Sequence, residues 1–366
     1  MQIAQIQTLP EVINIIKVLM TGFLAFILAF LVTPLWTKIL YKYRIGIKIK
    51  EKSVDGKELT FISKLHASKN GTPTMGGVIV WFSVAILILA SHYIFPWLAK
   101  IIGINFIARL DFFSRSQTWL LLFVLVTSGI LGLFDDYMSI RGWGKNKGGG
   151  MRFAMRFWWL FLIAIVGAWW FYGKLQWDII HVPAMGDFSI GFWYIPVFIF
   201  IIFFTAISSN ETDGLDGLNG GVLLFAFASF AIISVFQNKI DLASFSAAIA
   251  GAILAFLWFN IYPARFFMGD TGAMALGTTL GVTAMLTNSA LVLFIIVFIY
   301  VLESGSVVIQ LTSKKLFKKK VFLAAPLHHH FEAKGWPEPK VTMRAWIFTA
   351  VTAIIGVIVG ILGMGK

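Results

Sequence analysis

The chain has 366 residues, 58% of them hydrophobic, with a formal net charge of +13 and no cysteine. This composition excludes a soluble globular domain, and the lack of cysteine excludes disulfides and thiolate metal sites. Apolar runs of about 20 residues, long enough to cross about 30 Å of hydrocarbon, recur along the chain. They predict an all-α fold, that of a polytopic integral membrane protein.

We predict ten membrane spans and treat residues 1–366 as a single transmembrane domain. The first span is too long for the apolar core of a cleavable signal peptide. The eighth is short and rich in Gly and Thr. In chain order the predicted spans are 12–36, 76–99, 118–136, 153–172, 191–209, 219–237, 242–260, 273–288, 290–312 and 343–364.

The basic residues are clustered, with nine Lys and Arg in residues 38–69, five in 141–156 and eight in 314–344. The positive-inside rule places these segments in the cytoplasm, which explains the net charge without nucleic-acid binding. Ten spans then put both termini outside. The cytoplasmic connections are 37–75, 137–152, 210–218, 261–272 and 313–342, so all the polar motifs described below lie at one face.

The first motif is the adjacent pair Asp135 and Asp136 in GLFDDY, at the end of the third span. A carboxylate at membrane depth is costly and usually functional, whereas a pair at a helix end facing headgroup water is ordinary. Neighbouring helical residues point about 100° apart. If the pair is functional, the two carboxylates should therefore divide their work between a metal or phosphate and a proton.

Two Gly-rich segments carry further acids. NETDGLDGLNGG places Asp213 and Asp216 three residues apart, on one face if the segment is helical, although it is also typical of a turn between spans. FFMGDTG places Asp270 beside the pair Phe266–Phe267, where one ring could stack on a nucleobase. The alternative is an interfacial aromatic belt with Asp270 capping the next helix.

Half of the six histidines form the run His328, His329 and His330. Zinc ligands are usually spaced by several residues, so the run favours phosphate binding over zinc, with a solvated polar loop as the alternative. Carboxylates that hold Mg²⁺, together with Lys, Arg and His, are typical of phosphoryl-transfer sites. The sequence lacks GxxxxGK[ST], so it gives no support to a P-loop pump.

These residues resemble the phospho-N-acetylmuramoyl-pentapeptide transferases, a family within the polyprenyl-phosphate N-acetylhexosamine-1-phosphate transferase superfamily. The Asp pair and the GD motif are shared across the superfamily, whereas the first and last matching stretches point to this branch. In chain order the matching stretches are KNGTPTMGG (69–77), GLFDDY (132–137), TDGLDGL (212–218), WFNIYPARFFMGDTG (258–272) and APLHHHFEAKGWPEPKV (325–341).

The resemblance implies a ten-helix homodimer in the bacterial inner (cytoplasmic) membrane. It also implies Mg²⁺-dependent transfer of phospho-MurNAc-pentapeptide from UDP-MurNAc-pentapeptide to undecaprenyl phosphate. The products would be lipid I and UMP, in the first membrane step of peptidoglycan synthesis.

The resemblance also implies residue roles. Asp270 would bind Mg²⁺, with Asp136 as a further candidate ligand. Phe267 would stack on uracil, Asn260 would lie beside the metal, and His328 and His329 would contact the diphosphate. The implied catalytic residues are Asp135, Asp136, Asp270, His328 and His329, and the implied substrate-binding residues are Lys69, Thr74, Arg156, Asn210, Asp213, Asp216, Asn260, Phe267 and His330.

Two positions depart from the family pattern. Glu211 stands where relatives usually have Leu, and Arg156 is the best match to a Lys of the relatives. Arg keeps the charge of Lys but differs in geometry. The roles of these two residues and the alignment of GWGKNKGGG, which is longer than expected, are therefore open.

Several alternatives remain at the level of sequence. The transfer could be a direct displacement with Asp135 orienting or deprotonating the lipid phosphate, or a two-step reaction through a phospho-enzyme on an Asp carboxylate. The N-acetylglucosamine-1-phosphate branch is disfavoured by the histidine run. A secondary transporter would place its acids near the bilayer midplane in repeated halves, which the sequence does not indicate.

Overall fold

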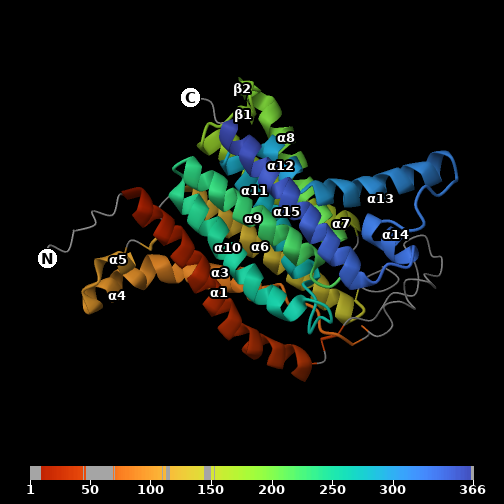
Figure 1. The fold of residues 1–366 in the computed structure, drawn as a ribbon, viewed down its shortest axis with the longest axis horizontal. Coiled ribbons are helices and arrows are strands. Elements are labelled where there is room, and N and C mark those ends of the chain that lie inside the picture. Colours follow the sequence, from red (N-terminus) through yellow and green to blue (C-terminus); the bar gives the residue numbers. More distant parts are fainter. Residues whose placement is uncertain are drawn as a thin grey trace.

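Long helices packed side by side form most of the structure (Figure 1). The computed structural model describes residues 10–43, 45–46, 69, 71–108, 110–112, 116–143, 150–151 and 153–363. The helices are α1 (Pro10–Lys42), α3 (Val78–Tyr93), α4 (Phe95–Ile102), α5 (Asn105–Ala108), α6 (Ser116–Ile140), α7 (Phe153–Trp169), α8 (Tyr194–Thr212), α9 (Leu218–Phe236), α10 (Ile240–Asn260), α11 (Gly269–Leu286), α12 (Ala290–Ile296), α13 (Phe298–Leu316), α14 (Leu327–Ala333) and α15 (Glu338–Leu362).

The membrane-spanning character predicted from the sequence is confirmed. Among the described residues, seven helices are long and apolar enough to cross a membrane, and two bent pairs raise the number to nine. The pair α3–α4 bends by 51°, and α12–α13 bends by 84°. Helix α11, which matches the predicted eighth span, is not among them. The chain is therefore a polytopic membrane protein.

Helix α11 lies inside the bundle, where every residue from Thr271 to Leu286 is buried. Its Gly- and Thr-rich sequence suits this position, because small side chains let neighbouring helices approach closely. The threonine hydroxyls donate to carbonyls one turn earlier, as Thr279 does to Ala275 at 2.7 Å and Thr283 to Thr279 at 2.8 Å. The weak apolar signal of the eighth predicted span thus reflects contact with protein rather than lipid.

The predicted ninth span, 290–312, is not one straight helix. Val297 leaves the helical region (φ −103°, ψ 43°), and the chain turns there between α12 and α13. Figure 1 shows α13 projecting from the side of the bundle, with α14 following it. In the sequence this segment is a continuous apolar run, because a change of direction at one residue leaves the hydropathy pattern unchanged.

A short antiparallel hairpin, β1 (Ile179–Val182) and β2 (Gly186–Ser189), adds two strands to the predicted all-α fold. The His181 amide donates to the Asn288 side chain at 3.0 Å, and the His181 ring contacts the carbonyl of Gly363. The hairpin therefore packs at the C-terminal end of α15. The polar motifs lie at the other end, where α15 begins.

Helices α6 and α11 touch through Gly132, and this contact supports the acidic motifs on both helices. A Cβ at Gly132 would lie 2.3 Å from the carbonyl oxygen of Asp270 and 2.6 Å from the Cα of Thr271. Gly132→Ala is therefore expected to lower the free energy of unfolding by about 1–3 kcal/mol and to displace Asp270. Thermal unfolding and activity of the purified variant measure the two effects.

Gly305→Ala on α13 is the matched control, because no other part of the described structure lies within 4 Å of a Cβ built there. It should unfold at or slightly above the wild-type temperature, since alanine favours helix over glycine. Equal losses of unfolding temperature and activity in the two variants would contradict a specific role for the close contact at Gly132.

Candidate functional site

Asp136 connects the end of α6 to the start of α11. Its Oδ1 accepts a hydrogen bond from the Asp270 amide, and its Oδ2 accepts one from the Thr271 amide, both at 3.1 Å. Carboxylate oxygens are good partners for the unpaired amides of a helix N-terminus. Asp136 therefore positions Asp270, and both of its oxygens are already engaged with backbone.

Asp135 and Asp270 meet at Arg156, near the start of α7. Arg156 Nε forms an ion pair with Asp135 Oδ2, and Nη2 lies 3.2 Å from Asp270 Oδ2. Asp135 Oδ1 also accepts from the Met151 amide at 2.7 Å, and Asp270 Oδ1 accepts from Asn210 Nδ2 at 2.5 Å. Asp135 is fully buried, whereas 21% of the Asp270 side chain is exposed. Asp270 is thus the reachable carboxylate of the pair.

The turn after α8 brings Asp213 to the same place. The Gly269 amide donates to Asp213 Oδ2 at 3.1 Å, and Thr74 Oγ1 lies 2.7 Å from where a Cβ of Gly269 would be. Burial raises the pKa of the Asp213 carboxyl well above its usual range, and the nearby Asp270 adds to this. Asp213 and Thr74 therefore enclose the backbone that carries Asp270.

Asp213→Asn is expected to stabilise the folded protein at neutral and alkaline pH. The folded-state pKa of Asp213 lies above the unfolded value, so its ionisation lowers stability as pH rises from the unfolded pKa through the folded pKa. Asparagine keeps an acceptor for the Gly269 amide and removes that cost. Unfolding temperatures measured from pH 5 to 8 should show an advantage for the variant that grows with pH. A difference in unfolding temperature that stays constant or shrinks with pH would contradict a raised pKa for Asp213.

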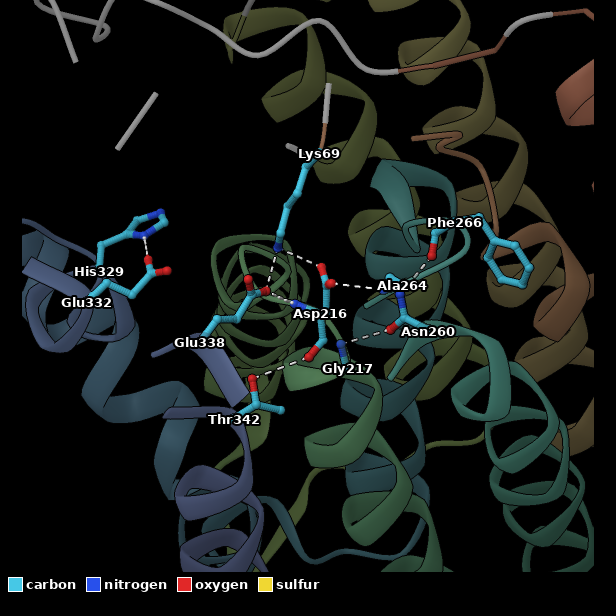
Figure 2. Close-up of polar contacts among 10 residues, drawn as sticks. All are labelled: Lys69, Asp216, Gly217, Asn260, Ala264, Phe266, His329, Glu332, Glu338 and Thr342. Atoms are coloured by element: carbon cyan, nitrogen blue, oxygen red, sulfur yellow. Dashed lines mark hydrogen bonds and ion pairs between the residues drawn. The ribbon is translucent and has the colours of Figure 1, made fainter. Parts of the chain in front are cut away.

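A second cluster surrounds Lys69, as Figure 2 shows. Lys69 Nζ lies 2.6 Å from Asp216 Oδ1 and also pairs with Glu338, the first residue of α15. The Asp216 amide donates to Glu338 Oε1 at 2.6 Å. The Lys69 ammonium lies 5.5 Å from the centroid of the Phe267 ring, the expected stacking residue. Two predicted substrate-binding residues, Lys69 and Phe267, are thus neighbours, and α15 helps to hold them.

The side chains of Asn260 and Asp216 form hydrogen bonds with backbone groups (Figure 2). Asn260 Oδ1 accepts from the Gly217 amide at 3.1 Å, and its Nδ2 donates to the Phe266 carbonyl at 2.9 Å. Asp216 Oδ2 accepts from the Ala264 amide at 3.0 Å. The Asn260 amide group is buried and shapes the loop before Asp270, and its implied place beside the metal stays a prediction.

The three histidines lie on α14, and each has a different partner. His328 Nδ1 lies 3.0 Å from Glu303 Oε2, and His329 Nδ1 lies 2.7 Å from Glu332 Oε2. His330 Nδ1 accepts from the Leu323 amide at 3.1 Å, and desolvation lowers the pKa of His330. His328 reaches the turn of Asp213, since a Cβ at Gly214 would lie 2.4 Å from His328 Nε2.

Sequence reasoning missed three acids that hold predicted site residues: Glu303, Glu332 and Glu338. Glu303 had a usable signal, because an ionisable residue inside an apolar run is a functional candidate by default. Glu332 and Glu338 lie within the stretch HHHFEAKGWPEPK but carried no assigned role. The unusual Glu211 accepts a hydrogen bond from Ser304 Oγ at 2.5 Å. Its acidic side chain thus has a partner on α13.

The described part of the chain holds no group of three or more His, Asp and Glu side chains arranged to bind a metal alone. Mg²⁺ in phosphoryl-transfer sites is usually held by one or two carboxylates, with substrate phosphates and water completing its shell. The partly exposed Asp270 supplies one such carboxylate. The donor set therefore fits a Mg²⁺ ion that binds together with a phosphate ligand.

Comparisons with known proteins agree with this arrangement of motifs. The model of glycosyl transferase family 4 matches residues 118–288, and signature 1 of phospho-N-acetylmuramoyl-pentapeptide-transferase matches residues 69–79. The chain is 38% identical to the phospho-N-acetylmuramoyl-pentapeptide-transferase of Levilactobacillus brevis, over 80% of this chain and 85% of that protein. Its identity to the proteins of that name from Anoxybacillus flavithermus and Chloroflexus aurantiacus is 34% and 32%, over 93% of this chain and 97% and 89% of theirs. The chain therefore belongs to the phospho-N-acetylmuramoyl-pentapeptide-transferase family.

Proposed function

We propose that this enzyme transfers phospho-MurNAc-pentapeptide from UDP-MurNAc-pentapeptide to undecaprenyl phosphate, giving lipid I and UMP. The observation that carries the proposal is the meeting of Asp135, Arg156 and Asp270 at one end of the bundle. Paired carboxylates and a guanidinium are suited to positioning phosphoryl groups and stabilising their charge. Membership of the family supports the identity of the substrates.

In the proposed reaction an oxygen of the lipid phosphate attacks the β-phosphorus of the donor. The new P–O bond forms as the bond from that phosphorus to the bridging oxygen breaks, and UMP leaves with the bond's electrons. Asp135 orients the lipid phosphate or accepts its proton, while Arg156 and Lys69 balance phosphate charge. Mg²⁺ held by Asp270 would supply Lewis-acid stabilisation of the diphosphate.

The proposal includes the placement of the enzyme in its membrane. Ten crossings, with α12–α13 as the broken ninth, would put both termini outside and the site at the cytoplasmic face of the bacterial inner membrane. The eight basic residues of segment 314–344, which flank α14 at the site end, support this orientation. A homodimer is the proposed assembly, by similarity to the family.

The donor test compares UDP-MurNAc-pentapeptide with UDP-N-acetylglucosamine, each labelled in the sugar, using purified enzyme, Mg²⁺ and polyprenyl phosphate. Label should enter the lipid fraction from the first donor only. Transfer from UDP-N-acetylglucosamine alone would assign the enzyme to the other branch of the superfamily. Omitting Mg²⁺ by chelation should stop transfer, and its restoration should recover the rate.

Direct displacement predicts that no phospho-enzyme forms when the lipid is absent. Rapid quench of the enzyme with Mg²⁺ and donor labelled in the β-phosphate should therefore leave the protein unlabelled. UMP should appear only after polyprenyl phosphate is added. A burst of UMP without lipid, together with labelled protein, would establish the two-step reaction instead.

A further inference from the structure

Glu303 is a buried acid for which the proposed reaction has no stated use. It lies on α13, just after the bend at Val297, and only 5% of the residue is exposed. An ionised carboxylate in such a position requires a partner. Its partner is His328, the first residue of the histidine run on α14.

Glu303 binds His328 at two points. Glu303 Oε2 lies 3.2 Å from the His328 amide nitrogen, which donates to it, and 3.0 Å from the ring nitrogen Nδ1. An ionised carboxylate can only accept hydrogen bonds, so Nδ1 carries the proton. The two bonds together fix both the start of α14 and the orientation of the imidazole ring.

This arrangement leaves Nε2 as the ring nitrogen available to a ligand. His328 is 1% exposed, and Nε2 is buried without a hydrogen-bond partner among the described residues. Nε2 faces Gly214, where a Cβ would lie 2.4 Å away, so no other residue could occupy that position in the turn between Asp213 and Asp216. A buried polar atom without a partner in the protein is well placed to bond to a substrate.

The charged and titratable neighbours of His328 come from three elements. Glu303 approaches from α13, and Glu211 at the end of α8 is linked to the same helix by Ser304 Oγ at 2.5 Å. On α14 the His329 ring lies 4.2 Å from the His328 ring between centroids, and His329 pairs with Glu332. Of these acids, only Glu303 bonds to His328.

We propose that Glu303 is a positioning residue, which holds the His328 imidazolium by Nδ1–H so that Nε2–H points to the turn 213–216 and donates a hydrogen bond to a phosphoryl oxygen of the donor. This inference rests on the proposed function, because it assigns a phosphate ligand to His328. Glu303 does not itself touch substrate. Its effect on turnover passes through the orientation of the ring.

A double-mutant cycle tests the proposal, with Glu303→Gln, His328→Asn and the two combined. Glu303→Gln keeps the volume of the side chain, but its amide can either accept from or donate to Nδ1, so the ring is no longer held in one form. We expect kcat to fall about 100-fold, the size of effect seen when a partner that orients a functional histidine is removed, while the donor KM changes much less. His328→Asn retains an N–H for Glu303 and removes Nε2, so it should lose turnover while still folding.

The double variant should have the same residual rate as His328→Asn alone, because Glu303 acts only through the ring that is missing. Radiolabelled donor makes that residual rate measurable. A further loss of about 100-fold on adding Glu303→Gln to His328→Asn would overturn the proposal, as would wild-type kcat in Glu303→Gln. Gly305→Ala lies on the same helix, where a Cβ would contact nothing else in the described part of the chain, and should leave turnover unchanged. Failure of the wild-type enzyme to release UMP would instead refute the proposed function.

Discussion

Asp270→Asn is expected to lower the rate of UMP release by about 10³-fold, because it removes the proposed metal ligand. Loss of several kcal/mol of stabilisation by a metal ion corresponds to a factor of this size. The change should also remove the ion pair with Arg156, whose Nη2 lies 3.2 Å from Asp270 Oδ2. Turnover measured against Mg²⁺ concentration should show no recovery at high Mg²⁺.

Asp241→Asn serves as the control, since Asp241 lies at the start of α10, at the other end of that helix from Asn260. Its carboxylate binds Lys17 Nζ at 3.2 Å. The control should keep wild-type turnover and Mg²⁺ dependence. Near-normal activity in Asp270→Asn would contradict the assignment of Asp270 as the metal ligand.

Asp135→Asn and Asp136→Asn are expected to fail in different ways, although the two residues are adjacent. Asp135→Asn keeps an acceptor for the Met151 amide but loses the ion pair with Arg156. Turnover should fall by about 10²- to 10⁴-fold, the usual contribution of an acid–base group, with little change in unfolding temperature. Asp135 thus acts mainly in the chemistry.

Asp136→Asn should lower both activity and stability. One of the amides of Asp270 and Thr271 would face an NH₂ group instead of an oxygen, and a buried unsatisfied donor costs about 1–3 kcal/mol. Thermal unfolding and kinetics of both variants separate the effects. Equal unfolding temperatures with equal kinetic defects would contradict this division between Asp135 and Asp136.

Hydropathy predicted most of the helices but not how they are arranged. The run 118–136 became part of α6, yet the run 290–312 was broken at Val297, because one residue with non-helical dihedrals does not alter hydropathy. The Gly- and Thr-rich run 273–288 became the buried helix α11. Its small residues were a packing signal that a search for lipid-facing segments undervalues. The hairpin that contains His181 and Asp187 was not predicted, because its strands are only four residues long.

The types of residue in the site were predictable, whereas their partners were not. The 100° offset of helical neighbours predicted that the side chains of Asp135 and Asp136 point in different directions. It did not predict that Asp136 would bind the backbone of α11. Pairs such as Lys69 with Glu338, and His328 with Glu303, join residues hundreds or tens of positions apart. Such pairs follow from tertiary packing, which the local patterns of one sequence do not encode.

UMP release by the purified protein in liposomes tests the central claim most directly. UMP should appear only when UDP-MurNAc-pentapeptide, polyprenyl phosphate and Mg²⁺ are all present, and one lipid-linked product should form for each UMP released. Absence of UMP together with uptake of labelled substrate into the vesicles would contradict the account and establish a transporter.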